Sequence, residues 1–340
     1  MLLMDSLVCV APGKLKLEKR SPPRPAAGEV LVRPRRIGIC GTDYHIYEGK
    51  HPFLQYPRVM GHELAVEVIE APSGSPLRTG EICVVNPYLS CGSCIACRRG
   101  KPNCCTRISV LGVHQDGGMQ DLIAIPETNL ISAPGLSLEA CATVEFLAIG
   151  AHAVRRAAIS PGDTALVIGA GPIGLGAALF AKLAGAKVTV LDRDTLRAQI
   201  TSNIIGTESI PFNESLDQTV AGQTEGNGFD VVFDATGNQA SMQRGFDFVA
   251  AGGRYVLVSV VKDQITFSDP DFHRRELTLY GSRNATHEDF STVIAALRSG
   301  NVPLDKIITH RTSLAEAAHN LPKWAHEKSG LIKALIAIDG

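Results

Sequence analysis

The pattern of apolar and polar positions changes character along the chain. In the first part, short apolar runs such as Glu29–Arg33 and Leu64–Ile69 lie between segments that contain proline and glycine, which is typical of strands joined by turns. Met119–Ile125 indicates a further strand, which Gly117 and Gly118 introduce. We therefore expect a mainly β N-terminal part.

From about residue 160, apolar runs alternate with helical stretches. The predicted strands are Thr164–Ile168, Lys187–Leu191, Phe229–Asp234 and Arg254–Val260, with a helix at Pro172–Ala184. Strands that alternate with helices predict a parallel sheet with helices on both faces, which is the α/β doubly wound class. The tail returns to mixed character, with helices at Phe290–Ser299 and Ser313–Trp324 and a strand at Gly330–Ile338.

Length and charge narrow the class of protein. The chain has 340 residues, 33 Lys and Arg against 34 Asp and Glu, and 45% hydrophobic residues, which predicts two domains. A net charge near zero argues against a general nucleic-acid or membrane-surface binder, because such proteins are usually basic. Thr164–Ala181 carries no charge, but its glycines and proline favour a buried strand–turn–helix over a membrane span. The first cation is Lys14, so no secretory leader is indicated, and we expect a soluble cytoplasmic protein.

The cysteines are concentrated in the first part of the chain. All nine lie within the first 141 residues: Cys9, Cys40, Cys83, Cys91, Cys94, Cys97, Cys104, Cys105 and Cys141. An odd number in a chain without a secretory leader indicates thiols and metal ligands rather than a disulfide framework. Because cysteine is absent from the rest of the chain, we place a domain boundary near residue 150.

A glycine motif follows one predicted strand and begins the next predicted helix. It reads Gly169-Ala-Gly171-Pro172-Ile173-Gly174, and Asp192 ends the following strand 21 residues after Gly171. Glycines let the backbone approach a pyrophosphate at the helix N-terminus, and the acid accepts hydrogen bonds from the ribose. The motif therefore predicts a dinucleotide site, with a tight strand–helix turn that binds nothing as the alternative.

The residues around Asp192 bear on the choice of cofactor. A carboxylate there would repel a 2′-phosphate and so favours NAD over NADP. The neighbouring Arg193 could partly offset this repulsion. Arg197 either flanks the adenine or is a solvated helix charge.

Four cysteines form a spacing that is typical of a metal site. Cys91, Cys94, Cys97 and Cys105 fall within 15 residues, and four thiolates with no open position describe a closed, structural zinc site. From spacing alone Cys104 competes with Cys105 for the fourth place. Nearby cations also allow a nucleic-acid-binding zinc ribbon, although the rest of the chain lacks a basic face; these cations are Arg98, Arg99, Lys101 and Arg107.

A second and sparser group combines different ligand types. Cys40 and His62-Glu63 lie about 20 residues apart, and Glu145 follows much later. One Cys, one His and one or two carboxylates make a mixed set, which is the kind that leaves a position open for substrate. The alternative for His62 and Glu63 is an ordinary surface or core pair.

Taken together, these motifs resemble the zinc-dependent medium-chain dehydrogenase/reductase family over essentially the whole chain, most closely its sorbitol and threonine dehydrogenase branch with the bacterial sugar-acid dehydrogenases. The resemblance implies a GroES-like β-barrel catalytic domain over residues 1–149 with a structural zinc lobe at about 86–107. It further implies a Rossmann NAD-binding domain over 150–282, a return segment over 283–340 that completes the catalytic domain, and a homotetramer.

The resemblance also assigns roles at the mixed site. It implies Cys40, His62 and Glu63 as catalytic zinc ligands and Glu145 as a glutamate that contacts the metal directly or through water. The remaining roles are Asp43 as the carboxylate that orients the zinc histidine, Thr42 and His45 as the groups that pass the alcohol proton outward, and Cys105 as the fourth structural ligand.

Three segments match family stretches that contact the cofactor or enter the active site. Asp234–Gly237, which contains Thr236, and Val258-Ser259-Val260 match stretches near the nicotinamide. Gly281-Ser282-Arg283-Asn284 matches the loop that enters the active site. The chain departs from the family at Phe146, where proline is usual, and at Ser259, where glycine is common.

The activity implied is reversible oxidation of a secondary alcohol of a polyol or sugar acid to a ketone, with NAD as hydride acceptor. Arg283 either pairs with a substrate carboxylate or contacts the cofactor. Threonine is the alternative substrate. A non-catalytic regulator that binds NAD and zinc is the alternative from another class, but such a protein could discard the mixed site that this chain retains.

Overall fold

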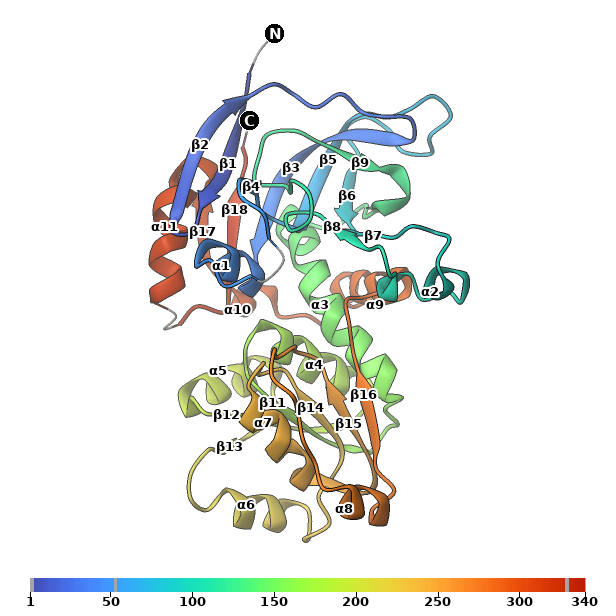
Figure 1. Cartoon of the computed structure of the whole chain (residues 1–340), viewed down its shortest axis with the longest axis vertical. Coiled ribbons are helices and arrows are strands. Elements are labelled where there is room, and N and C mark those ends of the chain that lie inside the picture. Colours follow the sequence, from blue (N-terminus) through green and yellow to red (C-terminus); the bar gives the residue numbers. More distant parts are fainter. Residues whose placement is uncertain (1–2, 52–53, 328–329, 340) are drawn as a thin grey trace. The chain divides into compact units, whose positions relative to one another are not determined.

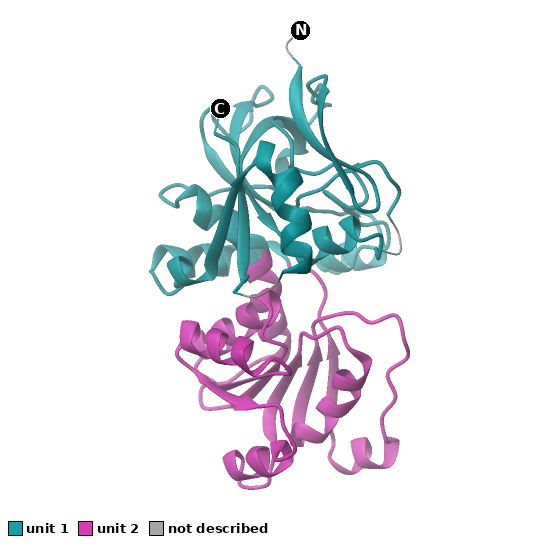
Figure 2. Ribbon diagram, turned by 90° about the vertical axis from the view of Figure 1, so that its left-hand side faces the viewer, with its two compact units in different colours: residues 1–145, 286–340 teal, residues 146–285 magenta. Residues whose placement is uncertain are grey.

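The computed structural model describes residues 3–51, 54–327 and 330–339. The chain forms two compact units, which Figure 2 shows in two colours. Unit 1 contains residues 1–145 and 286–340, and unit 2 contains residues 146–285. The sequence placed the boundaries after residues 149 and 282, a few residues away. The first observed boundary falls inside the helix α3 (Leu138–Ala157), whose composition does not change where its contacts do.

Unit 2 is built on a six-stranded parallel sheet (Figure 1). Its strands are β11 (Thr164–Ile168), β12 (Lys187–Asp192), β13 (Glu208–Pro211), β14 (Phe229–Asp234), β15 (Val249–Leu257) and β16 (Thr278–Gly281). They lie in the order β13-β12-β11-β14-β15-β16, which is the strand order of dinucleotide-binding folds. The predicted doubly wound sheet is confirmed. The strand predicted at 254–260 instead begins at Val249 and ends at Leu257, because the backbone of Val258 and Ser259 bonds to the carbonyl of Asp234 at the strand end.

Helices flank both faces of this sheet (Figure 2). They are α4 (Pro172–Leu183), α5 (Thr195–Ile205), α6 (Leu216–Gln223), α7 (Gln239–Arg244) and α8 (Asp269–Arg274). The last part of α3 packs against α4 without intervening side chains. A Cβ on Gly150 would lie 2.3 Å from the carbonyl carbon of Gly176, so the two backbones meet directly.

Unit 1 contains the remaining sheets. Its strands are β1 (Met4–Ala11), β2 (Lys14–Arg20), β3 (Glu29–Ile39), β4 (Arg58–Val59), β5 (Glu63–Glu70), β6 (Ile82–Val85), β7 (Tyr88–Leu89), β8 (Ser109–Val110), β9 (Ile123–Pro126), β10 (Leu130–Ser132), β17 (Ile308–Ser313) and β18 (Lys333–Ala337). A seven-stranded sheet runs β10-β6-β5-β3-β18-β17 with β9 paired to β3, beside a three-stranded sheet β2-β1-β4 and the two-stranded β7-β8. The predicted strand at 119–125 is a strand only from Ile123 onward, because the backbone of Met119 instead bonds to Leu7 and Met60.

The return segment completes the core of unit 1. Its helices, with those of the first segment, are α1 (Gly41–Tyr47), α2 (Ile95–Arg98), α9 (His287–Arg298), α10 (Leu304–Ile307) and α11 (Leu314–His326). Strand β18 pairs antiparallel with β3 and α11 places Leu321 in the same apolar cluster as Val30 and Val66. None of the helices in the described ranges combines the length and apolar character that crossing a bilayer requires.

The close approach of α3 and α4 gives a testable prediction for unit 2. Gly150→Ala should lower the free energy of unfolding by about 2 kcal/mol, because the new methyl group has to displace backbone. Gly222→Ala is the matched control, since Gly222 lies in α6 with nothing within 4 Å of the added Cβ. In this control the free energy of unfolding should rise by about 0.5–1 kcal/mol, because alanine favours the helix more than glycine does. Urea denaturation measures both, and equal effects of the two variants would contradict the packing.

Candidate functional site

The glycine motif of unit 2 forms a close turn between β11 and α4. Gly169 has a φ of 99°, and a Cβ on Gly174 would lie 1.7 Å from the carbonyl oxygen of Gly169. Gly171 is the N-cap of α4, with no atom within 4 Å of its missing Cβ, and Pro172 occupies the first turn. The N-terminus of this 12-residue helix is therefore accessible to an anion, which its unpaired amides and dipole favour.

Asp192 is held at the end of the neighbouring strand. β11 and β12 are paired in register, so Asp192 follows directly beside the turn. Its Oδ2 accepts a hydrogen bond from the amide of Ala170 at 2.7 Å, and its Oδ1 accepts one from the amide of Asp194 at 2.9 Å. Each oxygen keeps further lone pairs for ribose hydroxyls. The carboxylate is thus fixed beside the glycine turn, where an acid that accepts hydrogen bonds from the ribose is expected.

A cavity of about 970 Å³ lies along this edge of the sheet. The predicted residues that line it are Gly169, Gly171, Asp192, Arg193, Arg197 and Thr236. Phe212 and Arg244 also line it, and sequence reasoning missed both. The predicted residues outside the lining are Pro172, Ile173 and Gly174 in α4, Val258, Ser259 and Val260 after β15, and Ser282 and Arg283 after β16. Of these last five, Ser282 is buried, whereas Val260 and Arg283 are exposed.

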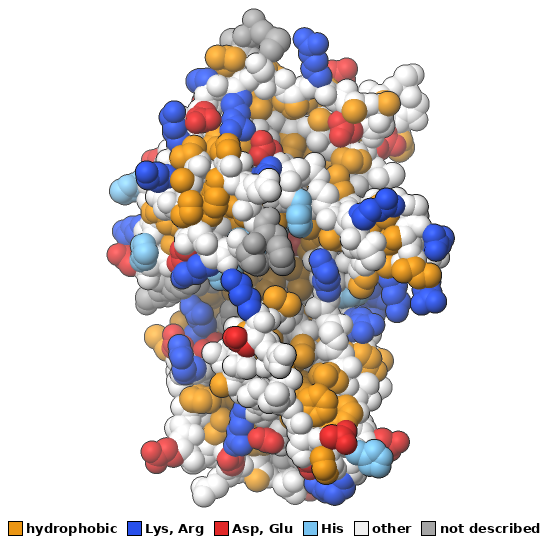
Figure 3. Space-filling model, viewed as in Figure 1, with side chains coloured by type: hydrophobic (Ala, Val, Ile, Leu, Met, Phe, Trp, Pro, Cys, Tyr) orange, Lys and Arg blue, Asp and Glu red, His pale blue; other side chains and the backbone are white. Residues whose placement is uncertain are grey.

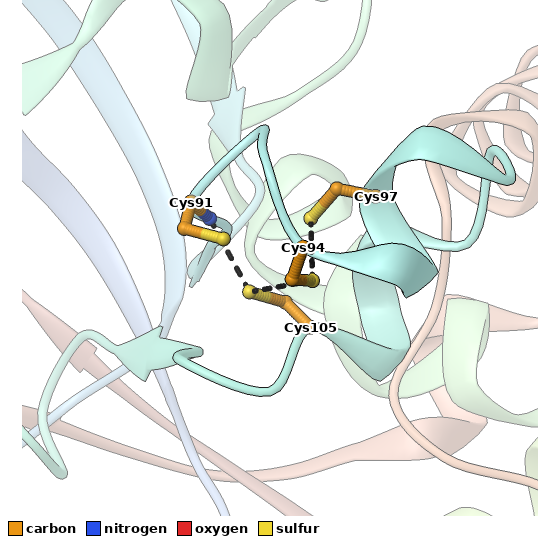
Figure 4. Close-up of side chains that lie close together, drawn as sticks. All are labelled: Cys91, Cys94, Cys97 and Cys105. Atoms are coloured by element: carbon orange, nitrogen blue, oxygen red, sulfur yellow. Dashed lines mark hydrogen bonds between the residues drawn. The ribbon is translucent and has the colours of Figure 1, made fainter.

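The structure gathers four cysteines in unit 1 (Figure 4). One ligand atom of each of Cys91, Cys94, Cys97 and Cys105 lies within 4.8 Å of the others. The sulfur of Cys94 is 3.5 Å from that of Cys97 and 3.9 Å from that of Cys105. Cys104 is exposed and outside the group. Between the two candidates left open by spacing, the chain therefore brings Cys105 to the cluster.

The chain around these cysteines supports thiolates. The strands β7 and β8 form a short antiparallel stem for the loop that carries the four cysteines. The amide of Ser93 lowers the pKa of Cys91 to about 5, and the amide of Cys97 lowers that of Cys94 to about 6. Desolvation, by contrast, raises the pKa of Cys97 to about 11. Four closely spaced thiols, two of them readily deprotonated, are a donor set that fits a structural zinc site. Basic side chains gather over this part of the surface, where Figure 1 places α2 (Figure 3).

A second cluster combines Cys40, His62 and Glu63, whose ligand atoms also lie within 4.8 Å of one another. Cys40 is the N-cap of α1 and directly follows β3, while Glu63 begins the paired strand β5 and His62 directly precedes it. Ligand atoms around one tetrahedral zinc lie about 3.3–3.8 Å apart, given bond lengths of about 2.0–2.3 Å. The three side chains therefore need only small adjustments to share one ion.

Asp43 connects the two turns that carry these ligands. Its Oδ2 accepts from the amide of Cys40 at 2.8 Å and its Oδ1 accepts from the amide of Gly61 at 3.2 Å. Oδ1 also lies 3.9 Å from Nδ1 of His62. Burial raises the pKa of Asp43, while His62 and the two amides act against this shift. The carboxylate is thus placed next to the histidine, as expected for a residue that orients a metal ligand.

Glu63 has a buried cation as its partner. The ammonium of Lys333, which is 1% exposed, donates to Oε1 of Glu63 at 2.7 Å, to Oε2 at 2.6 Å and to the carbonyl of Ile39 at 3.2 Å. These three bonds use all three donors of the ammonium. Gly38 faces Glu63 across the β3–β5 ladder, and a Cβ there would lie 1.9 Å from Oε2. The missing side chain leaves the space that the carboxylate occupies.

Glu145 lies outside the three-residue cluster but close enough to interact with its charges. It is buried, and its Oε1 accepts a hydrogen bond from the hydroxyl of Tyr88. Its Oε2 is buried without a hydrogen-bond partner among the described residues. Burial raises the pKa of Glu145 to about 7, while the charge of His62 acts against this shift. An orphaned buried oxygen beside the cluster fits a ligand that a metal ion or its water would satisfy.

Thr42 and His45 lie three residues apart on α1, which begins at the N-cap Cys40. Residues at this spacing are neighbours on one helix face. Thr42 is half-buried and His45 is exposed. The pair therefore reaches from the buried cluster end of the helix toward solvent.

The mixed cluster fits zinc chemically. A thiolate, an imidazole and a carboxylate are three zinc donors, and three protein donors leave a fourth position for substrate, whereas the four-cysteine cluster leaves none. His62 and Glu63 are buried and Cys40 is half-buried, so two of the three ligands are shielded from bulk water. Lys333, Gly38 and Tyr88 were not found from sequence, because their contacts to Glu63 or Glu145 join distant segments.

The chain matches known proteins along its length. Residues 26–135 match the alcohol dehydrogenase GroES-like domain family, and residues 172–299 match the zinc-binding dehydrogenase family. The chain is 41% identical over 335 residues to the L-galactonate-5-dehydrogenase of Escherichia coli K12, with 98% of each chain covered. It is 33% identical over 302 residues to the L-threonine 3-dehydrogenase of Pyrococcus horikoshii, with 85% of each covered.

A solved structure shows the same fold. The crystal structure of the alcohol dehydrogenase RspB from Escherichia coli CFT073, complexed with the cofactor NADH, has a TM-score of 0.92 and 29% identity. The match covers 99% of this chain and 100% of that one. Together with the family matches, it confirms the predicted GroES-like and dinucleotide-binding folds.

The buried ion pair gives a prediction for unit 1. Lys333→Met should lower the free energy of unfolding by about 3 kcal/mol or more, because it leaves the carboxylate of Glu63 buried without its cation. Lys19→Met is the matched control, since Lys19 pairs with Asp5 at 2.9 Å while 61% exposed. Its loss should change stability by about 1 kcal/mol or less. Urea denaturation of the two variants compares them, and similar small effects would show that Glu63 does not depend on Lys333.

Proposed function

Because the chain belongs to the zinc-dependent medium-chain dehydrogenase/reductase superfamily, we propose that it oxidises a secondary hydroxyl of a six-carbon sugar acid, using NAD. In this reaction the carbinol C–H bond breaks and its hydride reduces NAD to NADH. The hydroxyl proton leaves to solvent, and the carbinol carbon becomes a ketone. The reverse direction reduces the ketone.

The observation that carries this proposal is the mixed cluster of Cys40, His62 and Glu63. A structural protein or a zinc-binding regulator needs only a closed site, and the four-cysteine cluster already provides one. A second, buried set with three different donor types favours catalysis, because it leaves a position for a substrate oxygen.

The two bound groups would supply the reactive chemistry. Zinc held by Cys40, His62 and Glu63 provides Lewis acidity that lowers the pKa of a substrate hydroxyl, and a nicotinamide provides the hydride acceptor. Within the protein, Asp43 holds the two ligand-bearing turns through the amides of Cys40 and Gly61. The helix N-terminus at Gly171 and the carboxylate of Asp192 would bind the pyrophosphate and ribose.

The proton would leave along α1. Thr42 begins the path as a half-buried hydroxyl, which can accept one proton while it donates another. His45, one helical turn later and exposed, would release the proton to solvent. The route uses two groups whose roles follow from the sequence resemblance, and their spacing on one short helix supports it.

The substrate class follows from the relatives. Sequence identity of 41% over 98% of the chain to an L-galactonate-5-dehydrogenase favours a hexonate whose C5 hydroxyl is oxidised. Arg283, exposed after β16, is the candidate for pairing with the substrate carboxylate, since its guanidinium fork matches that group. Threonine is the second candidate, because the chain is 33% identical to an L-threonine 3-dehydrogenase.

NAD is the proposed cofactor. Asp192 lines the cavity and is fixed by two backbone amides, so its carboxylate cannot turn away from a 2′-phosphate without breaking them. Solved structures of similar likeness contain NADH in one case and NADP in another, so the choice of NAD rests on Asp192. A homotetramer rests on the family resemblance and a cytoplasmic location on the charge pattern of the sequence, and both stay predictions.

The activity is tested by the appearance of NADH at a wavelength of about 340 nm, where reduced nicotinamide absorbs, across L-galactonate, other aldonates, polyols and threonine. We expect the highest kcat/KM with an aldonate, and loss of turnover after treatment with a chelator.

Cys40→Ser should abolish turnover while NAD binding to unit 2 is unchanged, because it removes one donor of the mixed cluster. Cys104→Ser is the matched control and should keep full activity, since Cys104 is exposed and outside both clusters. Full activity of the Cys40 variant would refute the zinc mechanism, and threonine as best substrate would replace the aldonate.

The cofactor choice is tested by Asp192→Ser. We expect the ratio of kcat/KM with NAD to that with NADP to fall at least about tenfold, a change of about 1.4 kcal/mol, because the variant removes both the ribose acceptor and the charge that repels phosphate. Arg193 and Arg197, which line the same cavity, can then attract the 2′-phosphate. Asp194→Asn is the control, because asparagine can still accept the amide of Arg197 at the N-cap of α5. An unchanged ratio in the Asp192 variant, or an equal shift in the control, would contradict this assignment.

A further inference from the structure

The two carboxylate oxygens of Glu145 have different surroundings. Oε1 accepts the hydroxyl hydrogen of Tyr88, whereas Oε2 is buried with no hydrogen-bond partner in the described part of the chain. Both residues are buried, with Glu145 at 2% and Tyr88 at 7% exposure. Glu145 also interacts electrostatically with His62, so it lies beside the mixed cluster. One oxygen is therefore tethered and the other remains available.

The backbone of Tyr88 is fixed from several directions. Its amide donates to Oδ1 of Asn86 at 3.1 Å, and its carbonyl accepts from Nδ2 of Asn129 at 3.4 Å. In the β7–β8 ladder it pairs with Val110. The ring of Tyr88 is buried and its backbone is held at both the amide and the carbonyl, so its hydroxyl has little freedom, which suits a group that sets the orientation of a carboxylate.

Tyr88 also stands at the base of the four-cysteine lobe. Strand β7 ends at Leu89, two residues before Cys91, and the lobe returns to β8 at Ser109. The same stem thus carries the cysteine cluster at one end and the donor to Glu145 within its first strand.

We propose that Tyr88 is a positioning residue for the catalytic metal: its hydroxyl holds Oε1 of Glu145 so that Oε2 is presented to the metal or to its water. This inference rests on the proposed zinc centre of Cys40, His62 and Glu63. In this proposal the β7–β8 ladder, which forms the stem of the cysteine lobe, also fixes the position of Tyr88 and thereby of Glu145 beside the mixed cluster.

Tyr88→Phe tests the proposal, because it removes the hydroxyl and keeps the ring. In the full-length protein with both metals bound, titration with a chromophoric chelator should show the mixed site losing metal about 10- to 100-fold more readily, the usual effect of removing a partner of a metal ligand. The four-cysteine site should keep its metal. In the cobalt-substituted protein, the visible absorption of cobalt at the mixed site should shift in wavelength or intensity, which a general loss of stability would not produce.

Tyr255→Phe is the matched control. Tyr255 is fully buried in unit 2, and its hydroxyl donates to the carbonyl of Met242 at 2.9 Å. Removing this hydroxyl should lower stability to a similar extent but leave the metal affinity and the cobalt spectrum as in the wild type.

A double substitution shows whether Tyr88 acts through Glu145. In the Glu145→Ala background the hydroxyl has no carboxylate to hold, so adding Tyr88→Phe should change the metal affinity by less than about twofold. An additive loss in the double variant, or a wild-type affinity and cobalt spectrum in Tyr88→Phe, would overturn the proposal. A wild-type protein that binds metal only at the four cysteines would instead refute the proposed function, so the two failures are distinguishable.

Discussion

The proposed metal centre of unit 1 depends on one buried carboxylate, that of Asp43. A buried charge is tolerated only where hydrogen bonds or a partner charge replace its hydration, and here two backbone amides do so. These amides belong to Cys40 and Gly61, which lie in separate turns, so the same bonds fix the separation of Cys40 and His62. Gly61 has a φ of 93°, and a Cβ on Gly117 would lie 2.2 Å from its carbonyl oxygen. The turn that precedes His62 is therefore held by the hydrogen bond from Gly61 to Asp43, and it fits because Gly61 and Gly117 have no side chains.

The remaining ligand, Glu63, is held by a different device. Its partner Lys333 arrives from the return segment through the strand order β5-β3-β18, so the centre is completed only when the end of the chain joins the sheet. The interruption by unit 2 thus has a physical consequence: the mixed cluster requires contacts between segments on both sides of the inserted domain. By contrast, the glycine turn and Asp192 are neighbours along one stretch of unit 2 and need no such closure.

This difference explains how much could be predicted from sequence. The strand Thr164–Ile168, the glycine turn and the cysteine lobe are local patterns that the sequence shows directly. Within the lobe, the spacing left Cys104 and Cys105 open, and the family resemblance pointed to Cys105, which the structure brings to the cluster. Lys333 was missed because 270 residues separate it from Glu63, and a single lysine before an apolar strand carries no signal of burial. Gly38 was missed because its role is to leave space for the carboxylate of Glu63, and the sequence pattern does not show which side chain fills that space. Tyr88 and Glu145 are 57 residues apart, and nothing in either local pattern indicates their hydrogen bond.

The two clusters of unit 1 also differ in how the charge of a bound metal would be balanced, and this difference agrees with the different burial of their residues. Four thiolates and one Zn²⁺ carry a net charge of about −2, which suits a partly exposed lobe with the guanidinium of Arg107 beside Cys91. One thiolate, the carboxylate of Glu63 and a neutral imidazole around Zn²⁺ would sum to about zero, and in the same sum the ammonium of Lys333 would offset the buried carboxylate of Asp43. Because the ammonium of Lys333 already bonds both oxygens of Glu63, this carboxylate would be shared between two cations once a metal binds, and its bond to the metal would be the one most easily weakened. With zinc bound, the proposed centre would therefore be close to neutral overall and would accept the negative charge of a substrate hydroxyl that has lost its proton, whereas the cysteine cluster would offer neither the open position nor the charge balance.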